Sequence, residues 1–182
     1  MLYVMRHGKT DWNNKYKLQG RTDVPLNNEG INSGKLAHDE YIDVPFDICF
    51  CSPLARAKQT AELLLEGRNI PIIYDDRLVE MSFGIYEGQE RIFEQENNDI
   101  INLFKKPEKY VIPVENGESF TDLFERVSSF LNDSVEPLLK EGKNVLIVGH
   151  GALNSAIVTI VKQLEIKDFW SYGIPNCKLI KL

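Results

Sequence analysis

Two short apolar segments, near opposite ends of the chain, each lead directly into a histidine followed by a glycine. Residues 2–5 precede Arg6-His7-Gly8, and residues 145–149 precede His150-Gly151. Continuous apolar runs of this length are typical of buried strands in a parallel sheet. Because ligands bind at the edge where the carboxyl ends of such strands lie, the pattern predicts that both histidines meet there. The chain contains only 3 histidines, so this use of the residue is selective.

Three further apolar runs predict the rest of the sheet. They are residues 47–51, residues 70–74 and residues 177–182. Pro71 indicates an edge position for the second of these, and the third has the pattern of a half-exposed final strand. Helical patterns lie between the runs, so we expect an α/β three-layer sandwich with a mostly parallel central sheet flanked by helices.

Two helix starts are indicated by local signals. Ser52-Pro53 predicts an N-cap followed by proline at the first helical position. Ser119, with Asp122 three residues later, predicts a second cap. Residues of about 84–118 show less regular patterns, and we expect them to form an insertion of helix and loop over one end of the sheet.

Charged side chains come after the same strand ends. Arg6 lies beside His7, Arg56 falls one turn into the helix after the second strand, and Glu80 lies in the loop after the third. We therefore expect two imidazoles, two guanidinium groups and one carboxylate to converge on one rim of the sheet.

These residue types suit phosphoryl transfer. A neutral imidazole can attack phosphorus and form a phosphohistidine that water later hydrolyses, which divides one difficult step into two. Arg6 and Arg56 offer permanent positive charge to the non-bridging oxygens, and a second, protonated imidazole can stabilise the group in transfer. The leaving alkoxide needs a proton, for which Glu80 is the favoured donor. Other carboxylates lie near it in sequence: Asp76, Glu87 and Glu90.

Two other chemistries fit the pattern less well. His7, His150 and Glu80 have the residue types of a two-histidine, one-carboxylate iron site. The two neighbouring arginines would repel a divalent cation and attract an anion, which argues against a metal. Residues 149–154 partly match a dinucleotide fingerprint, but Asn154 replaces its third glycine and the segment lies late in the chain.

Composition narrows the class of protein further. A length of 182 residues suits one well-buried domain, expected to span residues 1–182. A net charge of −6 without a basic stripe argues against nucleic-acid binding. We expect no membrane partner, since no apolar run approaches the ~18–20 residues of a span and no signal peptide is evident. The 3 cysteines lack zinc spacing, which favours buried thiols in a reduced, cytoplasmic protein.

Residues 5–13 resemble the Arg-His-Gly-x-Thr signature of the histidine phosphatase superfamily, in its phosphoglycerate-mutase-like branch. Further stretches resemble the same family in the same order: residues 18–26, 51–61, 78–88, 116–119 and 149–151. The resemblance spans nearly the whole chain, is closest in type to the broad-specificity and α-ribazole phosphatases, and implies a phosphoglycerate-mutase-like fold.

The resemblance also implies a role for each matching residue. It implies that His7 accepts the phosphoryl group, that Glu80 donates a proton, and that the phosphate pocket is built from Arg6, Arg56 and His150. Further phosphate or substrate contacts are implied at Asn13, Gln19, Gly20 and Gly151. The resemblance implies no metal or organic cofactor. Many relatives carry arginine or lysine where this chain has Ser155, which leaves substrate preference open.

The family that these residues resemble includes phosphatases, which hydrolyse the phosphohistidine, and mutases, which transfer its phosphoryl group back to a substrate. Cofactor-dependent mutases close their sites with extra segments and a C-terminal tail, whereas this chain stops soon after its last expected strand. We therefore predict a metal-independent phosphomonoesterase for small-molecule phosphate esters, with a phosphoglycerate mutase as the alternative. A catalytically silent regulatory or phosphate-binding protein is a third hypothesis, against which the complete set of site residues argues.

The substrate and the oligomeric state stay open. Sugar phosphates, phosphoglycerates, nucleotides and α-ribazole phosphate are candidate substrates, and a monomer or weak homodimer is expected. The residues expected at the pocket mouth are Lys15, Tyr16, Arg21, Phe83, Tyr86 and the 90–115 segment. Those expected to have no part in recognition are His38, on the surface, and the packing residues Trp12 and Trp170.

Overall fold

In the described part of the chain, five strands form one sheet in the order β3-β2-β4-β1-β5. Their bounds are β1 (Leu2–Arg6), β2 (Ile48–Cys51), β3 (Ile72–Tyr74), β4 (Val145–Gly149) and β5 (Leu179–Lys181). The computed structural model describes residues 1–95, 99–111 and 113–182. Within it the first four strands run parallel, and β5 pairs antiparallel with β1 at the sheet edge. The predicted α/β fold with a mostly parallel sheet is confirmed.

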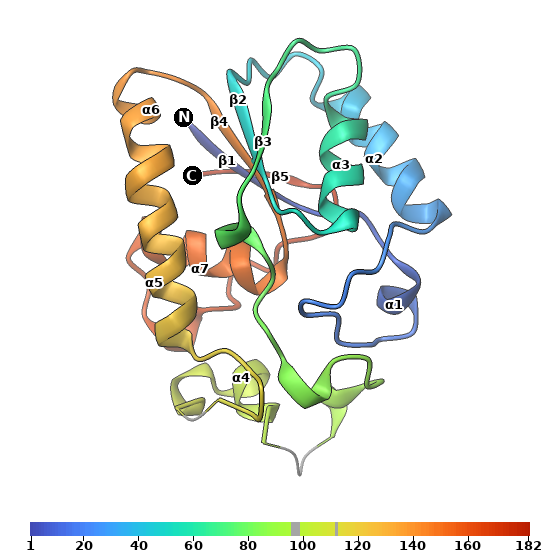
Figure 1. The fold of residues 1–182 in the computed structure, drawn as a ribbon, viewed down its shortest axis with the longest axis vertical. Coiled ribbons are helices and arrows are strands. Elements are labelled where there is room, and N and C mark those ends of the chain that lie inside the picture. The colour runs from blue at the N-terminus through green and yellow to red at the C-terminus, as the bar shows by residue number, and fades with distance from the viewer. Residues whose placement is uncertain (96–98, 112) are drawn as a thin grey trace.

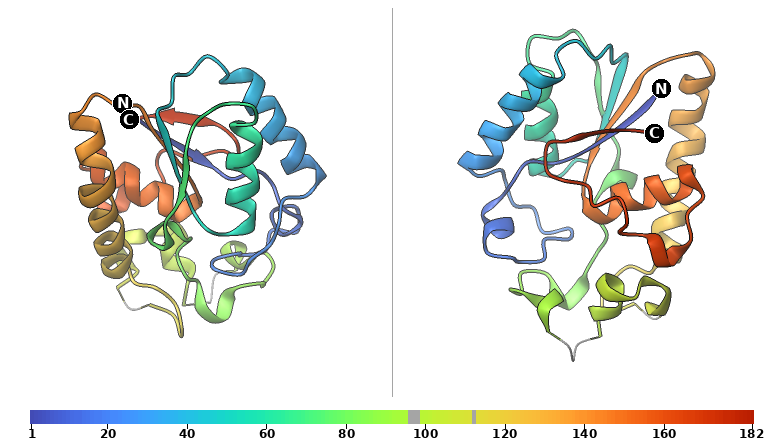
Figure 2. Two further views of the ribbon diagram at one scale, coloured as in Figure 1. Left: turned by 45° about the horizontal axis from the view of Figure 1, so that its top comes forward. Right: turned by 180° about the vertical axis from the view of Figure 1, so that it is seen from behind.

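Helices cover both faces of the sheet (Figures 1 and 2). The helices of the described residues are α1 (Asp11–Asn14), α2 (Asn28–Glu40), α3 (Ala55–Leu64), α4 (Ile101–Lys105), α5 (Phe120–Phe130), α6 (Glu136–Lys140) and α7 (Gly151–Lys162). α2 packs on α3 over one face, and α5 packs on α7 over the other. A π-helical turn, Leu131–Val135, joins α5 to α6.

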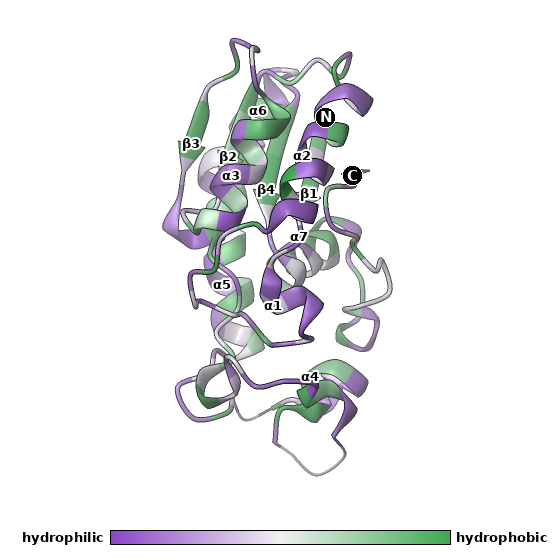
Figure 3. Cartoon of the chain, turned by 90° about the vertical axis from the view of Figure 1, so that its right-hand side faces the viewer, coloured by the Kyte–Doolittle hydropathy of each residue, from purple (hydrophilic) through white to green (hydrophobic). Residues whose placement is uncertain are grey.

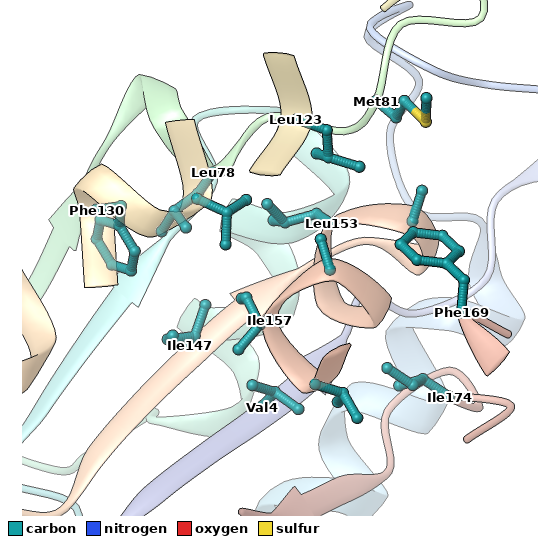
Figure 4. Close-up of a cluster of buried hydrophobic side chains, with 14 of the residues drawn as sticks. Val4, Leu78, Met81, Leu123, Phe130, Ile147, Leu153, Ile157, Phe169 and Ile174 are labelled. Carbon is teal, nitrogen blue, oxygen red and sulfur yellow. The ribbon is translucent and has the colours of Figure 1, made fainter. Parts of the chain in front are cut away.

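Alternate residues of the central strands divide the interior into two cores. Val4 and Ile147 belong to the core under α5 and α7, whereas Met5 and Val148 belong to the core under α2 and α3. Figure 4 shows Val4 and Ile147 facing Ile157 of α7 in the larger core. In Figure 3 the strands are hydrophobic while α2 is mostly hydrophilic, as expected of an outer layer.

The pairing of β1 with β4 brings the two histidine segments together. Met5 lies opposite Val148 and Arg6 opposite Gly149, and the His7 backbone N–H donates to the Gly149 carbonyl at 2.9 Å. β4 is buried along its whole length, as a parallel strand with two neighbours should be. The register therefore ends both strands at the same level of the sheet.

One predicted helix cap is confirmed and the other is wrong. Ser119 caps α5 in a reciprocal capping box with Asp122. α3, in contrast, begins at Ala55 with Leu54 as its N-cap residue and without a side-chain cap. The Ser52 hydroxyl instead contacts His150 at 2.7 Å and accepts the Leu54 backbone N–H at 3.3 Å, just before the helix begins.

The segment 84–118 contains short turns and α4, and lies beyond the carboxyl ends of the strands, at the bottom of Figure 1. Residues 96–98 and 112 of this segment lie outside the described residues. No helix in the described ranges is long and apolar enough to span a membrane.

Candidate active site

A cavity of about 290 Å³ lies at the carboxyl edge of the sheet. Eight of the residues singled out in the sequence line it: Arg6, His7, Asn13, Gln19, Gly20, Arg56, Glu80 and Gly151. The ninth, His150, is fully buried, and its ring centroid lies 5.2 Å from that of His7. Segments from both ends of the chain and from its middle therefore meet in one small space.

The His7 ring is fixed by the backbone of the next residue. Its Nδ1 lies 2.7 Å from the Gly8 carbonyl oxygen, so Nδ1 carries the proton and Nε2 keeps its lone pair. Burial, and after it the charges of Arg56 and Arg6, hold the pKa of His7 well below its usual range. The ring is therefore neutral at neutral pH.

The loop that carries His7 is tied to α3. Thr60 accepts the Gly8 backbone N–H at 2.9 Å, and its hydroxyl donates to the Arg56 carbonyl at 2.7 Å. Both Thr60 and Arg56 are fully buried. A change in the first turns of α3 would therefore move His7 and Arg56 together.

His150 is held by a side chain from a neighbouring strand. Its Nε2 lies 2.7 Å from Ser52 Oγ, which also accepts the Leu54 backbone N–H at 3.3 Å. The Ser52 hydroxyl can donate to this nitrogen or accept from it, and Nδ1 is buried without a partner among the described residues. Burial, and then Arg56 and His7, hold the pKa of His150 well below its usual range.

The two guanidinium groups have unsatisfied N–H groups beside the cavity. Arg56 donates to the carbonyls of Thr22 at 2.9 Å and Gly20 at 2.7 Å, and Arg6 donates to that of Ile174 at 3.3 Å. The Nε atoms of both arginines are buried without a partner among the described residues. Burial lowers the pKa of both groups, yet guanidinium stays charged in proteins. Buried, unpaired cationic donors favour an anionic ligand.

Glu80 lies against the start of α7. Its Oε1 accepts the backbone N–H groups of Met81 and Leu153, each at 2.9 Å, and its Oε2 accepts that of Ala152 at 3.2 Å. A Cβ built on Gly151 would lie 3.6 Å from both Glu80 Oε2 and Arg6 Cζ, so the carboxylate and the guanidinium flank this glycine. The helix N-terminus and three N–H donors fix the carboxylate at the cavity wall.

The other nearby carboxylates have different surroundings. Glu87 accepts the backbone N–H groups of Arg21, Thr22 and Phe83, at 3.0–3.1 Å. Glu90 lies 3.6 Å from Lys17, and Asp76 is exposed in the turn before Glu80. Of these carboxylates, only Glu80 lines the cavity.

Asn13, Gln19 and Gly20 form a side of the cavity next to Arg56. Asn13 completes the capping box of α1 by accepting the Thr10 backbone N–H at 3.0 Å. Gln19 accepts the Thr10 hydroxyl at 3.1 Å. Gly20 has a φ of +54°, and a Cβ there would lie 2.0 Å from the Glu87 carboxylate, so only glycine fits.

The mouth of the cavity differs in part from the expectation. Tyr16 and Phe83 line it as expected, together with the 90–115 segment through Phe93 and Phe104. Among the described residues Lys15, Arg21 and Tyr86 do not line it, whereas Lys17 and Trp170 do. Arg21 is turned instead toward Glu118, at 3.2 Å.

Three further expectations can be compared with the structure. Trp12 packs as expected, under the Lys17 ammonium and against Gly88. His38 is half-buried and not a free surface residue, because its Nδ1 lies 3.0 Å from the Leu64 carbonyl. Ser155 is buried in α7 and does not line the cavity. Ser52 was missed as a site residue, because only the pairing of β2 with β4 in the structure places it beside His150.

No group of three histidine, cysteine or acidic side chains in the described part of the chain could hold a metal ion.

Comparisons with known proteins all point to the same family. The model of the histidine phosphatase superfamily (branch 1) matches residues 2–182. A 2,3-bisphosphoglycerate-dependent phosphoglycerate mutase of Cytophaga hutchinsonii is 32% identical, over 92% of this chain and 80% of that protein. Phosphoserine phosphatase 1 of Hydrogenobacter thermophilus is 29% identical, over 96% of this chain and 82% of that protein. The solved structure of Bacillus stearothermophilus YhfR has a TM-score of 0.85 at 30% identity, and the match covers 98% of this chain and 88% of that one.

Proposed function

The chain belongs to the histidine phosphatase superfamily, branch 1, and on this basis we propose that it is a phosphatase that hydrolyses small-molecule phosphate monoesters through a phosphohistidine on His7. One observation carries the proposal: the hydrogen bond from His7 Nδ1 to Gly8 leaves the lone pair of Nε2 available in a cavity lined by two arginines. A neutral nucleophile facing unpaired cationic donors suits attack on a phosphate ester.

In the first step His7 Nε2 attacks phosphorus. The N–P bond forms, the P–O bond to the alcohol breaks, and Glu80 gives its proton to the departing oxygen. Arg6 and Arg56 bind the non-bridging oxygens, and His150 donates from Nδ1 to the group in transfer. Asn13, Gln19, Gly20 and Gly151 border the phosphate and the leaving group.

In the second step water attacks the phosphohistidine. Glu80 takes a proton from this water, the N–P bond breaks, and inorganic phosphate leaves with His7 restored to its neutral form. The protein supplies every group in this scheme, and we propose that the reaction requires no metal. We further propose that residues 1–182 form one domain in which the 84–118 segment covers the cavity, since Phe93 and Phe104 line it.

Hydrolysis of p-nitrophenyl phosphate in the presence of EDTA tests the proposal. We expect phosphate release by the wild-type protein and none by His7→Ala. Alkaline quenching and mass spectrometry should find one added phosphoryl group on the peptide that contains His7, because the N–P bond is lost in acid. Activity that EDTA abolishes, or a phosphoryl group on another residue, would contradict the mechanism.

The mutase alternative is tested in the same preparation. It is favoured by the 32% identity to the phosphoglycerate mutase of Cytophaga hutchinsonii. Isomerisation of phosphoglycerate, primed with 2,3-bisphosphoglycerate, should be slower than hydrolysis of the aryl ester. The reverse order would replace the phosphatase proposal with the mutase.

A further inference from the structure

The cavity has two walls of opposite chemistry. Its floor holds His7, both arginines and Glu80. Its outer wall is formed by Tyr16, Lys17, Leu18, Phe83, Phe93, Phe104 and Trp170. These side chains come from three parts of the chain: the loop after α1, the 83–104 region, and the turn beyond α7. The phosphate and the rest of the substrate would therefore meet different surfaces.

The aromatic rings of the outer wall form a chain of ring–ring contacts. Phe93 lies 6.3 Å from Tyr16 and 6.4 Å from Phe104, measured between ring centroids. Phe104 in turn stacks on Trp170 at 5.9 Å with an interplanar angle of 23°, and lies 6.0 Å from Phe83. The rings form a continuous apolar surface above the floor.

The polar atom of Trp170 is directed away from this surface. Its indole N–H donates to the Leu103 carbonyl at 2.7 Å, which satisfies its single donor within the protein. Phe93, Phe104 and Trp170 are each half-buried, so part of each ring is open to a ligand. Flat apolar groups gain both burial and ring stacking at such a surface.

Lys17 is the single charged residue of the outer wall among the residues that the structure describes. Its ammonium lies 3.6 Å from the Glu90 carboxylate and 5.6 Å above the Trp12 ring. The Glu90 carboxylate offsets this charge in part, because the pair is partly exposed to solvent. A carboxylate on the leaving group would consequently lose its hydration against aromatic rings without gaining an unpaired cation.

Resting on the proposed function, we infer that the preferred substrates are phosphate monoesters whose alcohol carries a flat aromatic or heteroaromatic ring close to the phosphate. The cavity volume of about 290 Å³ is near the lower end of ligand sites, so it suits one ring system beside the phosphate. Alcohols that carry a carboxylate, as in phosphoserine or 3-phosphoglycerate, are disfavoured by the same wall.

Three esters of primary alcohols test this inference without the bias of an activated leaving group. They are 2-phenylethyl phosphate, propyl phosphate and phosphoserine. We expect kcat/KM for 2-phenylethyl phosphate to exceed that for phosphoserine by about tenfold or more, with propyl phosphate between them.

Two variants locate the preference in the outer wall. Phe104→Leu keeps an apolar side chain but removes the ring, and should raise KM for 2-phenylethyl phosphate about tenfold, with little change in kcat or with propyl phosphate. Phe124→Leu is the matched control, because Phe124 stacks on Phe120 at 5.9 Å outside the cavity. It should leave the ratio between the three esters unchanged.

The outcomes distinguish failure of this inference from failure of the proposed phosphatase function. Equal or faster hydrolysis of phosphoserine by the wild-type protein would overturn the inference and leave the phosphatase intact. A preference that survives Phe104→Leu as fully as Phe124→Leu would also overturn it. No hydrolysis of any ester, p-nitrophenyl phosphate included, would overturn the proposed function and the inference with it.

Discussion

The two histidines of the site share the same strand–His–Gly pattern but are anchored in opposite ways. His7 donates from Nδ1 to the carbonyl of its own neighbour, Gly8, whereas His150 is bonded through Nε2 to the side chain of Ser52. The Gly8 carbonyl fixes the His7 proton on Nδ1 and leaves a lone pair on Nε2, whereas the Ser52 hydroxyl can donate or accept. In the proposed mechanism Ser52 donates, so that His150 presents an N–H at Nδ1 and acts as a hydrogen-bond donor beside the nucleophile.

The anchors also differ in how they can be altered. A backbone carbonyl persists whatever side chain is substituted, so the His7 tautomer is insensitive to mutation elsewhere. The Ser52 hydroxyl can be removed by one substitution. The difference between the two anchors therefore predicts that substitutions of His7, His150 and Ser52 lower the proposed activity by successively smaller factors.

Replacement of the nucleophile has the largest expected effect. His7→Ala should lower kcat for p-nitrophenyl phosphate by about 10⁴-fold or more, since no other group can carry the phosphoryl intermediate. His38→Ala is the matched control, because His38 bonds to the Leu64 carbonyl and does not line the cavity. Comparable losses in both variants would show a general effect of losing a histidine and not a role for His7.

Replacement of the donor histidine should cost less. His150→Ala removes one N–H from the group in transfer while the nucleophile and both arginines stay, so we expect a fall in kcat of about 10²–10³-fold. Single-turnover measurement should find that formation of the phosphohistidine is slowed. A loss as complete as that of His7→Ala would mean that the two rings do not divide their roles as the tautomers indicate.

Removal of the anchor alone should cost still less. Ser52→Ala frees His150 Nε2, so the proton can move to it and Nδ1 can lose its donor function in part of the molecules. We expect kcat to fall about tenfold and the acid side of its pH profile to shift, with KM little changed. An unchanged pH profile with a reduced melting temperature would instead assign Ser52 a purely structural role.

The pH dependence of stability should show a property that both rings have, a pKa lowered by the fold. Both pKa values are held well below their usual range in the folded protein, so the unfolded chain binds more protons once the pH falls below about 6.5. The contribution of the two rings to the free energy of unfolding should therefore be constant above that pH and decrease below it. Chemical denaturation between neutral pH and pH 5 should give a steeper loss for the wild-type protein than for His150→Ala. Equal slopes would contradict the neutral state of this ring in the fold.

The positions of the strand ends could be predicted because continuous apolar runs identify parallel strands, and the sheet then aligns the residues just beyond each strand. Arg6, His7 and Arg56 were placed on one rim in this way, while the choice of Glu80 among the nearby carboxylates depended mostly on the family resemblance. The side chain of Ser52 could not be assigned, because Ser-Pro before a helical pattern is the same local signal whether the hydroxyl caps the helix or bonds elsewhere. Only the pairing of β2 with β4, which places Ser52 beside His150, decides between them.

The outer wall was less predictable for a similar reason. Lys15 and Lys17 flank Tyr16, which has a left-handed φ of 54°, and no sequence signal distinguishes Lys17, which lines the cavity, from Lys15, which does not. Trp170 lies after α7 in a segment without strand or helix periodicity, so its position in the sequence indicated a packing residue and not one that lines the cavity. It does pack, against Phe169 at 4.7 Å, while another part of the ring lines the cavity.

The contacts of residues 174–177 with the first strand have a consequence for the order of events during synthesis. The Ile174 carbonyl accepts Arg6 across 168 positions, the Asn176 amide donates to the His7 carbonyl across 169, and the Cys177 N–H donates to the Arg6 carbonyl at 2.9 Å. Arg6 and His7 are thus held by residues that the ribosome makes at least 168 positions later. Because Ile174 belongs to one core and Cys177 to the other, the last packing of both cores and the bracing of Arg6 and His7 take place together, late in synthesis.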